Sequence, residues 1–225
     1  MIEPGQQIDV VRTLQSLSGP VGDGRLLFTM LLDDSRSISN NHQRVIGGHN
    51  ECLSVLRRAP GKIVAQTQFL NGRVAEDYPP VADVAPLTTK TYPLSPGTPL
   101  FARTVETLQM VLTIAEKHPE DVTMTFVFTD GWDTSSHCLG VRATDVKKLV
   151  EPMFASGRHI VGAFAVYDGH TDFRRVFAEM GIPPQWIKIL RDWHDVGAAM
   201  TDVGQSVSQA SRSRKDFTET TNNGF

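Results

Sequence analysis

The chain has 225 residues, of which 40% are hydrophobic and 21% are charged, as is usual for a globular domain with an ample core. A net charge of −3 gives no sign of a nucleic-acid-binding surface. The apolar stretches are too short to span a membrane, and the first residues lack the basic and apolar blocks of a signal peptide. Cys52 and Cys138 are far apart without CxxC spacing, which favours free thiols. We therefore expect a cytoplasmic protein that contacts neither nucleic acid nor membrane.

The hydrophobic pattern predicts strands that alternate with helices along the chain. Residues 1–23 are expected to form an N-terminal extension with one short helical pattern. Strands are expected at Leu26–Leu32, Ile63–Phe69, Val122–Thr129, Ile160–Tyr167 and Trp186–Leu190. Helices are expected at 40–58, 98–118, 144–156, 171–180 and 195–212. The polar segment 213–225 is expected to be disordered.

The order of these elements predicts one α/β domain over residues 24–212. We expect a doubly wound, mostly parallel central sheet with helices on both faces. Asn71-Gly72 predicts a hairpin turn into a short antiparallel edge strand at Arg73–Ala75. Residues 77–97, rich in Pro, Thr and Ser, are expected to form a long surface loop. In such folds the ligand site lies at the carboxyl ends of the central strands.

Oxygen-bearing side chains follow two of the predicted strands. Asp33, Ser35 and Ser37 come directly after Leu26–Leu32, and Asp130 follows Val122–Thr129. Thr98 precedes a helix, where with Pro99 it is also typical of an N-cap. Carboxylates and hydroxyls are ligands that suit Mg²⁺ or Mn²⁺ rather than zinc. Taken singly, each group is equally typical of a cap or a turn.

The order and spacing of these groups resemble a known family. The segments Asp33-Asp34-Ser35-Arg36-Ser37, Gly97-Thr98 and Thr129-Asp130-Gly131 resemble the signature of a von Willebrand factor A domain with a metal-ion-dependent adhesion site. The resemblance covers roughly residues 24–212. The runs SPGTPLFARTVE and FVFTDGWDTSS look especially like bacterial stand-alone members.

This resemblance implies a Rossmann-like fold and a set of metal ligands. Ser35, Ser37 and Thr98 would supply hydroxyl oxygens, and Asp33 and Asp130 would act directly or through water. The expected ion is Mg²⁺, with Mn²⁺ or Ca²⁺ as alternatives. A further coordination position would be left for a Glu or Asp of a partner protein.

Three residues near the signature have no assigned role. Arg36 stands where relatives often carry a small Gly, and its charge would either weaken cation binding or pair with an incoming acid. Asp34 would offset Arg36 if it faced the site, but we expect it to face solvent. Trp132 is either an exposed anchor at the rim of the site or a half-buried packing residue. Asp133 and Asp168 are expected to be turn residues.

The sequence therefore favours a metal-dependent protein-binding module, not an enzyme. No nucleophile–base pair lies near the signature, and no lysine follows Gly97-Thr98 as in a phosphate-binding loop. The seven histidines show no i,i+4 pairing, which argues against a zinc site. The alternative is an Mg²⁺-dependent enzyme of phosphoryl transfer or hydrolysis that uses the same carboxylates.

Overall fold

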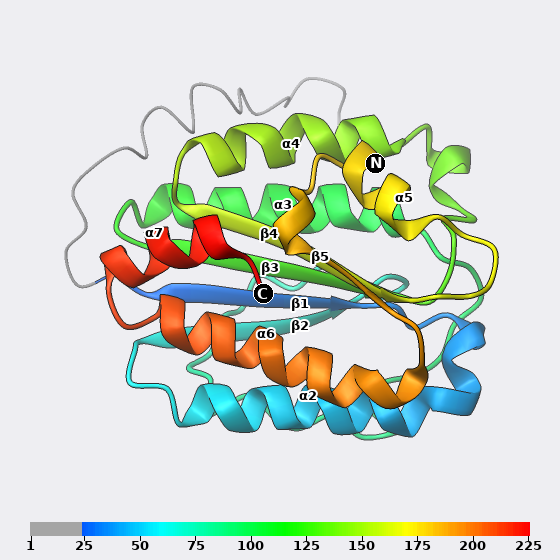
Figure 1. Cartoon of the computed structure of the whole chain (residues 1–225), viewed down its shortest axis with the longest axis horizontal. Helices are drawn as coiled ribbons and strands as arrows, with labels where there is room; N and C mark the ends of the chain where they lie inside the picture. The colour runs from blue at the N-terminus through cyan, green and yellow to red at the C-terminus, as the bar shows by residue number, and fades with distance from the viewer. Residues whose placement is uncertain (1–23) are drawn as a thin grey trace.

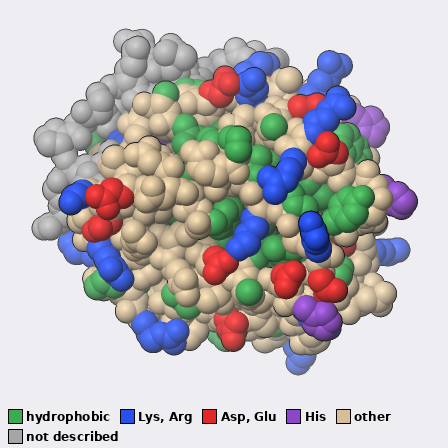
Figure 2. All heavy atoms as spheres, viewed as in Figure 1, with side chains coloured by type: hydrophobic (Ala, Val, Ile, Leu, Met, Phe, Trp, Pro, Cys, Tyr) green, Lys and Arg blue, Asp and Glu red, His purple; other side chains and the backbone are tan. Residues whose placement is uncertain are grey.

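The computed structural model describes residues 24–225, so the expected N-terminal extension lies outside the described residues. Within that range no helix is both long and apolar enough to cross a membrane. On the face seen in Figure 2, acidic and basic side chains are interspersed without forming a field of one sign.

The described residues form one parallel sheet in the order β2-β1-β3-β4-β5. The strands are β1 (Leu26–Leu32), β2 (Ile63–Phe69), β3 (Val122–Thr129), β4 (His159–Val166) and β5 (Ile187–Leu190). Every residue of β1, β3 and β4 is buried, as expected of central strands covered on both faces. Because β1 and β3 are neighbours and run in the same direction, their carboxyl ends meet at one edge.

Helices cover both faces of the sheet (Figure 1). The α-helices are α2 (His42–Arg57), α3 (Leu100–Lys117), α4 (Ala143–Ala155), α5 (Phe173–Glu179), α6 (Val196–Ala210) and α7 (Arg214–Asn223). Short 3₁₀ turns lie at Arg36–Asn41, Ser136–Leu139, Pro184–Trp186 and Trp193–Asp195. α2 packs against α6 on one face, while α3 and α4 pack together on the other. The α2–α6 contact is close because Gly48 lacks a Cβ, which would lie 2.9 Å from Met200 Sδ.

The expected antiparallel strand at Arg73–Ala75 is wrong, because these residues are not in a strand. The chain instead continues past the turn, and its backbone pairs with the edge of β2 at Pro79–Val81. There Ala65 N donates to Pro79 O at 3.0 Å, and Val81 N donates to Ile63 O at 3.1 Å. Pro80 forms a single antiparallel bridge with Val64, and prolines cannot extend a ladder of hydrogen bonds.

The expectation of disorder for 213–225 is also wrong. Ser213 caps α7 by accepting a hydrogen bond from Asp216 N at 3.1 Å, and Phe217 is fully buried. The ring of Phe225 packs 5.6 Å from that of Trp186 and 5.5 Å from that of Phe126. The average hydropathy of this segment is low, so its composition suggested disorder. A few aromatic contacts are enough to hold it against the domain.

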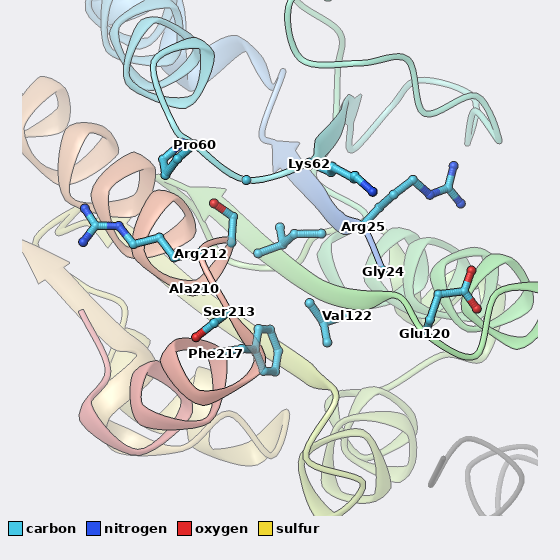
Figure 3. Close-up of a pocket in the computed structure, with 13 residues that line it drawn as sticks. Gly24, Arg25, Pro60, Lys62, Glu120, Val122, Ala210, Arg212, Ser213 and Phe217 are labelled. Atoms are coloured by element: carbon cyan, nitrogen blue, oxygen red, sulfur yellow. The ribbon is translucent and has the colours of Figure 1, made fainter. Parts of the chain in front are cut away.

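The turn between α6 and α7 helps to line a cavity at the amino-terminal edge of the sheet (Figure 3). This cavity has a volume of about 250 Å³. Its lining includes Arg25 before β1, Lys62 before β2 and Arg212 after α6. It lies at the opposite end of the strands from the side chains that the sequence singles out.

Candidate metal centre

The register between β1 and β3 brings two of the expected ligands to one edge. Leu32 pairs with Phe128, and Asp33 N continues the ladder by donating to Phe128 O at 2.9 Å. Asp33 therefore follows β1 at the level where β3 ends at Thr129 and Asp130 follows it. Both carboxylates are buried, with exposed fractions of 0% for Asp33 and 8% for Asp130.

The Asp33 carboxylate accepts two hydrogen bonds, one from its own loop and one from the end of β3. Its Oδ1 accepts from Ser35 N at 2.8 Å, so the chain turns immediately after the strand. Its Oδ2 accepts from the Thr129 hydroxyl at 2.6 Å. The carboxylate is thus fixed by its own loop and by the end of β3.

The two serines of the signature connect Asp33's loop to Asp130. The hydroxyls of Ser35 and Ser37 lie 2.7 Å apart, and Ser37 Oγ donates to Asp130 Oδ1 at 2.7 Å. Ser35 is buried whereas Ser37 is exposed. The structure therefore brings four of the five expected ligands into one connected group that opens to the surface at Ser37.

Thr98 joins the same edge through its backbone. Thr98 N donates to Thr134 Oγ1 at 2.9 Å, and Thr134 N donates to Thr98 O at 3.0 Å. Its segment therefore lies against the loop that follows Asp130. Among the described residues no partner is found for the Thr98 hydroxyl, which leaves its oxygen free for another ligand.

The expectation that Thr98 is the N-cap of the following helix is wrong. α3 begins at Leu100, and its free N–H groups are satisfied from a distant loop. Phe101 N donates to Asp133 Oδ2 at 2.9 Å, and Ala102 N donates to Ser136 Oγ at 2.9 Å. Asp133, expected to be only a turn residue, therefore caps α3 from outside the helix.

Asp34 faces neither the expected metal position nor solvent, which corrects the sequence-based expectation. It is 2% exposed, and its Oδ1 accepts from both Asn71 N and Asn71 Nδ2 at 2.9 Å. The same Asn71 amide donates to Gly97 O at 3.0 Å. Gly97 has a φ of +85°, which favours glycine. Asp34 thus positions the turn that carries Thr98.

Two further side chains complete the surroundings of the group. Arg36 is exposed and forms no ion pair within residues 24–225. Tyr92, which the sequence did not single out, is fully buried and donates its hydroxyl proton to the backbone oxygen of Asp33. Burial, reinforced by the charges of Asp33, Asp34 and Asp130, raises the pKa of Tyr92 well above its usual value.

The two carboxylates lie in an electrostatically unfavourable place. Burial raises the pKa of Asp33, and it raises the pKa of Asp130 to about 6, with the negative charges of Asp33 and Asp168 adding to the effect. Among the described side chains, no Lys, Arg or His forms an ion pair with either group. A cation bound here would remove this cost.

The donor set fits a hard divalent cation. It consists of carboxylate and hydroxyl oxygens, which suit Mg²⁺, Mn²⁺ or Ca²⁺. In the described part of the chain no three His, Cys, Asp or Glu side chains form a cluster able to hold a metal. An ion at this edge would therefore depend on the hydroxyls of Ser35, Ser37 and Thr98 as well as on the two carboxylates.

We compared the chain with known proteins to identify its fold. No family model matches the sequence, and no curated protein does. Among solved structures, proximal thread matrix protein 1 from the mussel byssus matches with a TM-score of 0.55 and 15% identity, over 84% of this chain and 48% of that one. A von Willebrand factor type A protein from Catenulispora acidiphila matches with a TM-score of 0.51 and 10% identity, over 83% and 43% of the two chains. Manganese-loaded TRAP from Plasmodium vivax matches with a TM-score of 0.50 and 14% identity, over 80% and 75%.

These likenesses show that the chain has the α/β fold of von Willebrand factor A domains. It spans about half the length of the first two structures. The mussel protein has also been solved with zinc in its metal-ion-dependent adhesion site, at a TM-score of 0.54 and 13% identity over 82% and 46% of the two chains. Neighbours with this fold thus bind divalent metals.

Proposed function

We propose that this protein is a metal-dependent protein-binding module. In this proposal a divalent ion held by Asp33, Ser35, Ser37, Thr98 and Asp130 bridges the domain to a Glu or Asp of a partner. One observation carries the proposal: Asp33 and Asp130 are buried at the same edge without a cationic partner among the described residues. Buried carboxylates are normally paired or bound to metal. The zinc-bound mussel protein and manganese-loaded TRAP support it by showing metal binding on this fold.

The ligands differ in charge, and this difference explains how a partner is attracted. Two carboxylates nearly neutralise a divalent ion, whereas Ser35, Ser37 and Thr98 add oxygen without adding charge. When bound, the ion supplies an open coordination position for a partner's carboxylate. The exposed Arg36 adds positive charge next to Ser37, which favours an incoming acid.

We further propose Mg²⁺ as the ion, with Mn²⁺ or Ca²⁺ as alternatives, because the donors are all hard oxygens. Cys52 and Cys138 are both free thiols in the structure, which supports a reducing, cytoplasmic location. The motif likeness to bacterial stand-alone members supports a bacterial origin. Neither nucleic acid nor membrane enters the proposal as a partner.

The ligand assignment is tested by substitutions that separate metal affinity from partner affinity. Ser37→Asp adds a negative charge, so it should keep or strengthen Mg²⁺ binding in calorimetry yet weaken capture of a partner from extract of the native host. Thr98→Ala should weaken both without removing the α3 cap, because Asp133 supplies that cap. If partner capture by wild type is equal in Mg²⁺ and in EDTA, the metal-bridged model is wrong.

The enzymatic alternative is tested separately. A phosphatase assay with p-nitrophenyl phosphate and Mg²⁺ should give no turnover above background if the domain is only a binding module. Turnover that disappears in Asp33→Asn would instead assign the carboxylates to Mg²⁺-dependent hydrolysis.

A further inference from the structure

Exposed apolar side chains gather around the edge that carries the candidate metal centre. Within residues 24–225 the large hydrophobic side chains that remain exposed are Trp132, Leu139 and Tyr167, with exposed fractions of 50%, 65% and 52%. Trp132 and Leu139 follow β3, and Tyr167 follows β4. All three therefore lie in the connections that follow strand carboxyl ends, Leu139 at the end of the 3₁₀ turn Ser136–Leu139. Of the three, Trp132 also lines a groove, which marks its surroundings as a surface that a partner can cover.

A groove of about 410 Å³ adjoins Trp132. Its apolar lining comes from Phe101 on α3, from Trp132 itself, from Val141 before α4 and from Ala143, the first residue of α4. His137, Arg142 and Glu179 contribute polar groups. The volume lies within the range of about 300–1,000 Å³ that is usual for ligand pockets.

Hydrogen bonds and a ring contact fix three of the residues around this groove. The carboxylate of Asp133 accepts hydrogen bonds from Phe101 N and Ser136 N, both at 2.9 Å, and another from the Ser136 hydroxyl. Trp132 packs edge-on against Phe101, with ring centroids 6.3 Å apart. A preformed groove binds without the cost of ordering its walls.

Two residues that line the groove lie close in sequence to expected metal ligands. Trp132 lies two residues after Asp130, and Phe101 lies three residues after Thr98. With about 3.8 Å between consecutive Cα atoms, Trp132 is no more than about 8 Å from Asp130 along the backbone. One short peptide segment can therefore reach both places.

We propose that the partner binds at two points. An Asp or Glu of one partner segment reaches the metal, and a large apolar side chain of the same segment enters the groove beside Trp132. This inference rests on the proposed function. A protein segment fits better than a small molecule because Leu139, in the same β3–α4 connection as Trp132, lies outside the groove and needs a larger surface to cover it.

The probe for this proposal is a random linear-peptide library displayed on phage and panned against the full chain in Mg²⁺. We expect selected peptides to contain an acidic residue and a large apolar residue at a fixed spacing. For a synthetic peptide of that motif, Trp132→Ala should weaken binding by about 30-fold, the size of a hot-spot loss. Tyr167→Ala, an exposed aromatic beside β4, is the matched control and should weaken binding by less than about fivefold.

A second peptide, with its apolar residue replaced by Ser, completes a double-mutant cycle. It should bind wild type about as weakly as the original peptide binds Trp132→Ala, with little further loss when the two changes are combined. Mg²⁺ affinity should be the same in both variants, which shows that each is folded with an intact metal centre.

The outcomes separate this inference from the proposed function. Mg²⁺-dependent binding of acidic peptides without an apolar residue, or full-strength binding by Trp132→Ala, overturns the groove and leaves the metal bridge standing. Peptides that bind equally well in EDTA overturn the metal bridge and the two-point mode with it. A concentration-dependent dimer that Trp132→Ala abolishes would identify a second copy as the occupant and overturn the peptide assignment.

Discussion

Strand β3 is bracketed by two buried aspartates in opposite circumstances. Asp121, just before the strand, accepts hydrogen bonds from Arg25 N at 2.8 Å and from Arg25 Nη2 at 2.7 Å. Asp130, just after the strand, accepts from the Ser37 hydroxyl, and no described cation forms an ion pair with it. The same residue type is thus structural where a guanidinium neutralises it and available for a ligand where only neutral donors surround it.

The largest expected effect comes from breaking the paired end. Asp121→Ala leaves Arg25 without its carboxylate and removes the acceptor of Arg25 N, so we expect a loss of about 2–4 kcal/mol in unfolding free energy. For a chain of this length that lowers the melting temperature by about 5–15 °C. Thermal melts of the variant and of wild type measure the difference. A change below about 2 °C would show that the pair contributes little.

A substitution at Asp130, at the other end of β3, should raise the free energy of unfolding instead of lowering it. Asp130→Asn removes a charge whose burial is unfavourable, so without metal the variant should be more stable than wild type at pH 7, by about 1–3 kcal/mol. Because the folded pKa of about 6 exceeds the ordinary 3.8, this advantage should be absent below pH 3.8 and grow as the pH rises to 6. Urea unfolding of both proteins in EDTA across that range measures it.

The titration of His49 also makes stability depend on pH, but it affects wild type and Asp130→Asn equally. Burial lowers the pKa of His49 to about 4, so both proteins lose stability as the pH falls from 6.5 towards 4. The informative quantity is therefore the difference between variant and wild type at each pH. If Asp130→Asn is destabilising at pH 7, the carboxylate must have a partner that offsets its burial.

Asp133 tests whether every aspartate at this edge of the sheet is available for a metal. Asp133 lies at the same edge as Asp130 but caps α3, so Asp133→Ala should cost about 2 kcal/mol whether or not Mg²⁺ is present. Thr98→Ala should cost less than this, because Thr98 is not the cap. Melting curves of the two variants, each in Mg²⁺ and in EDTA, make the comparison. Equal losses would show that the Asp133 cap contributes no more to stability than Thr98 does.

The smallest effect is stabilisation by the metal itself. With a dissociation constant on the order of 1 mM, about 10 mM Mg²⁺ should add about 1.4 kcal/mol and raise the melting temperature by about 3–6 °C. Asp33→Ala should show no such shift. The fold should also persist in EDTA, because every residue of β1, β3 and β4 is buried and this core does not depend on the ion. Loss of the far-UV helical signal in EDTA would contradict this.

The sequence was sufficient for the elements that form from a continuous local run of apolar residues. The runs Leu26–Leu32 and Val122–Thr129 predicted their strands with the bounds that the structure has. Parallel strands bring the residues after them together, so the order of elements alone places Asp33 and Asp130 at one edge. That they bind a metal stays a prediction.

Contacts between distant segments could not be anticipated in the same way. Asp34 reaches Asn71, and Asp133 reaches the start of α3, because the long connection from β2 to α3 folds back over the strand ends. Phe225 is anchored by Trp186 and Phe126, which are far from it in sequence. Local composition carries no signal for such contacts, and it suggested solvent exposure for Asp34 and disorder for the last residues.

The two prolines beside β2 limit how this sheet can associate with another chain. Pro79 and Pro80 have no N–H groups, and Val81 N already donates to Ile63 O. An approaching strand would therefore meet a backbone with no donor to offer at that margin. Edge-to-edge growth of the sheet, of the kind that leads to aggregation, is blocked along this part of β2. At this edge of the sheet, association is left to side chains.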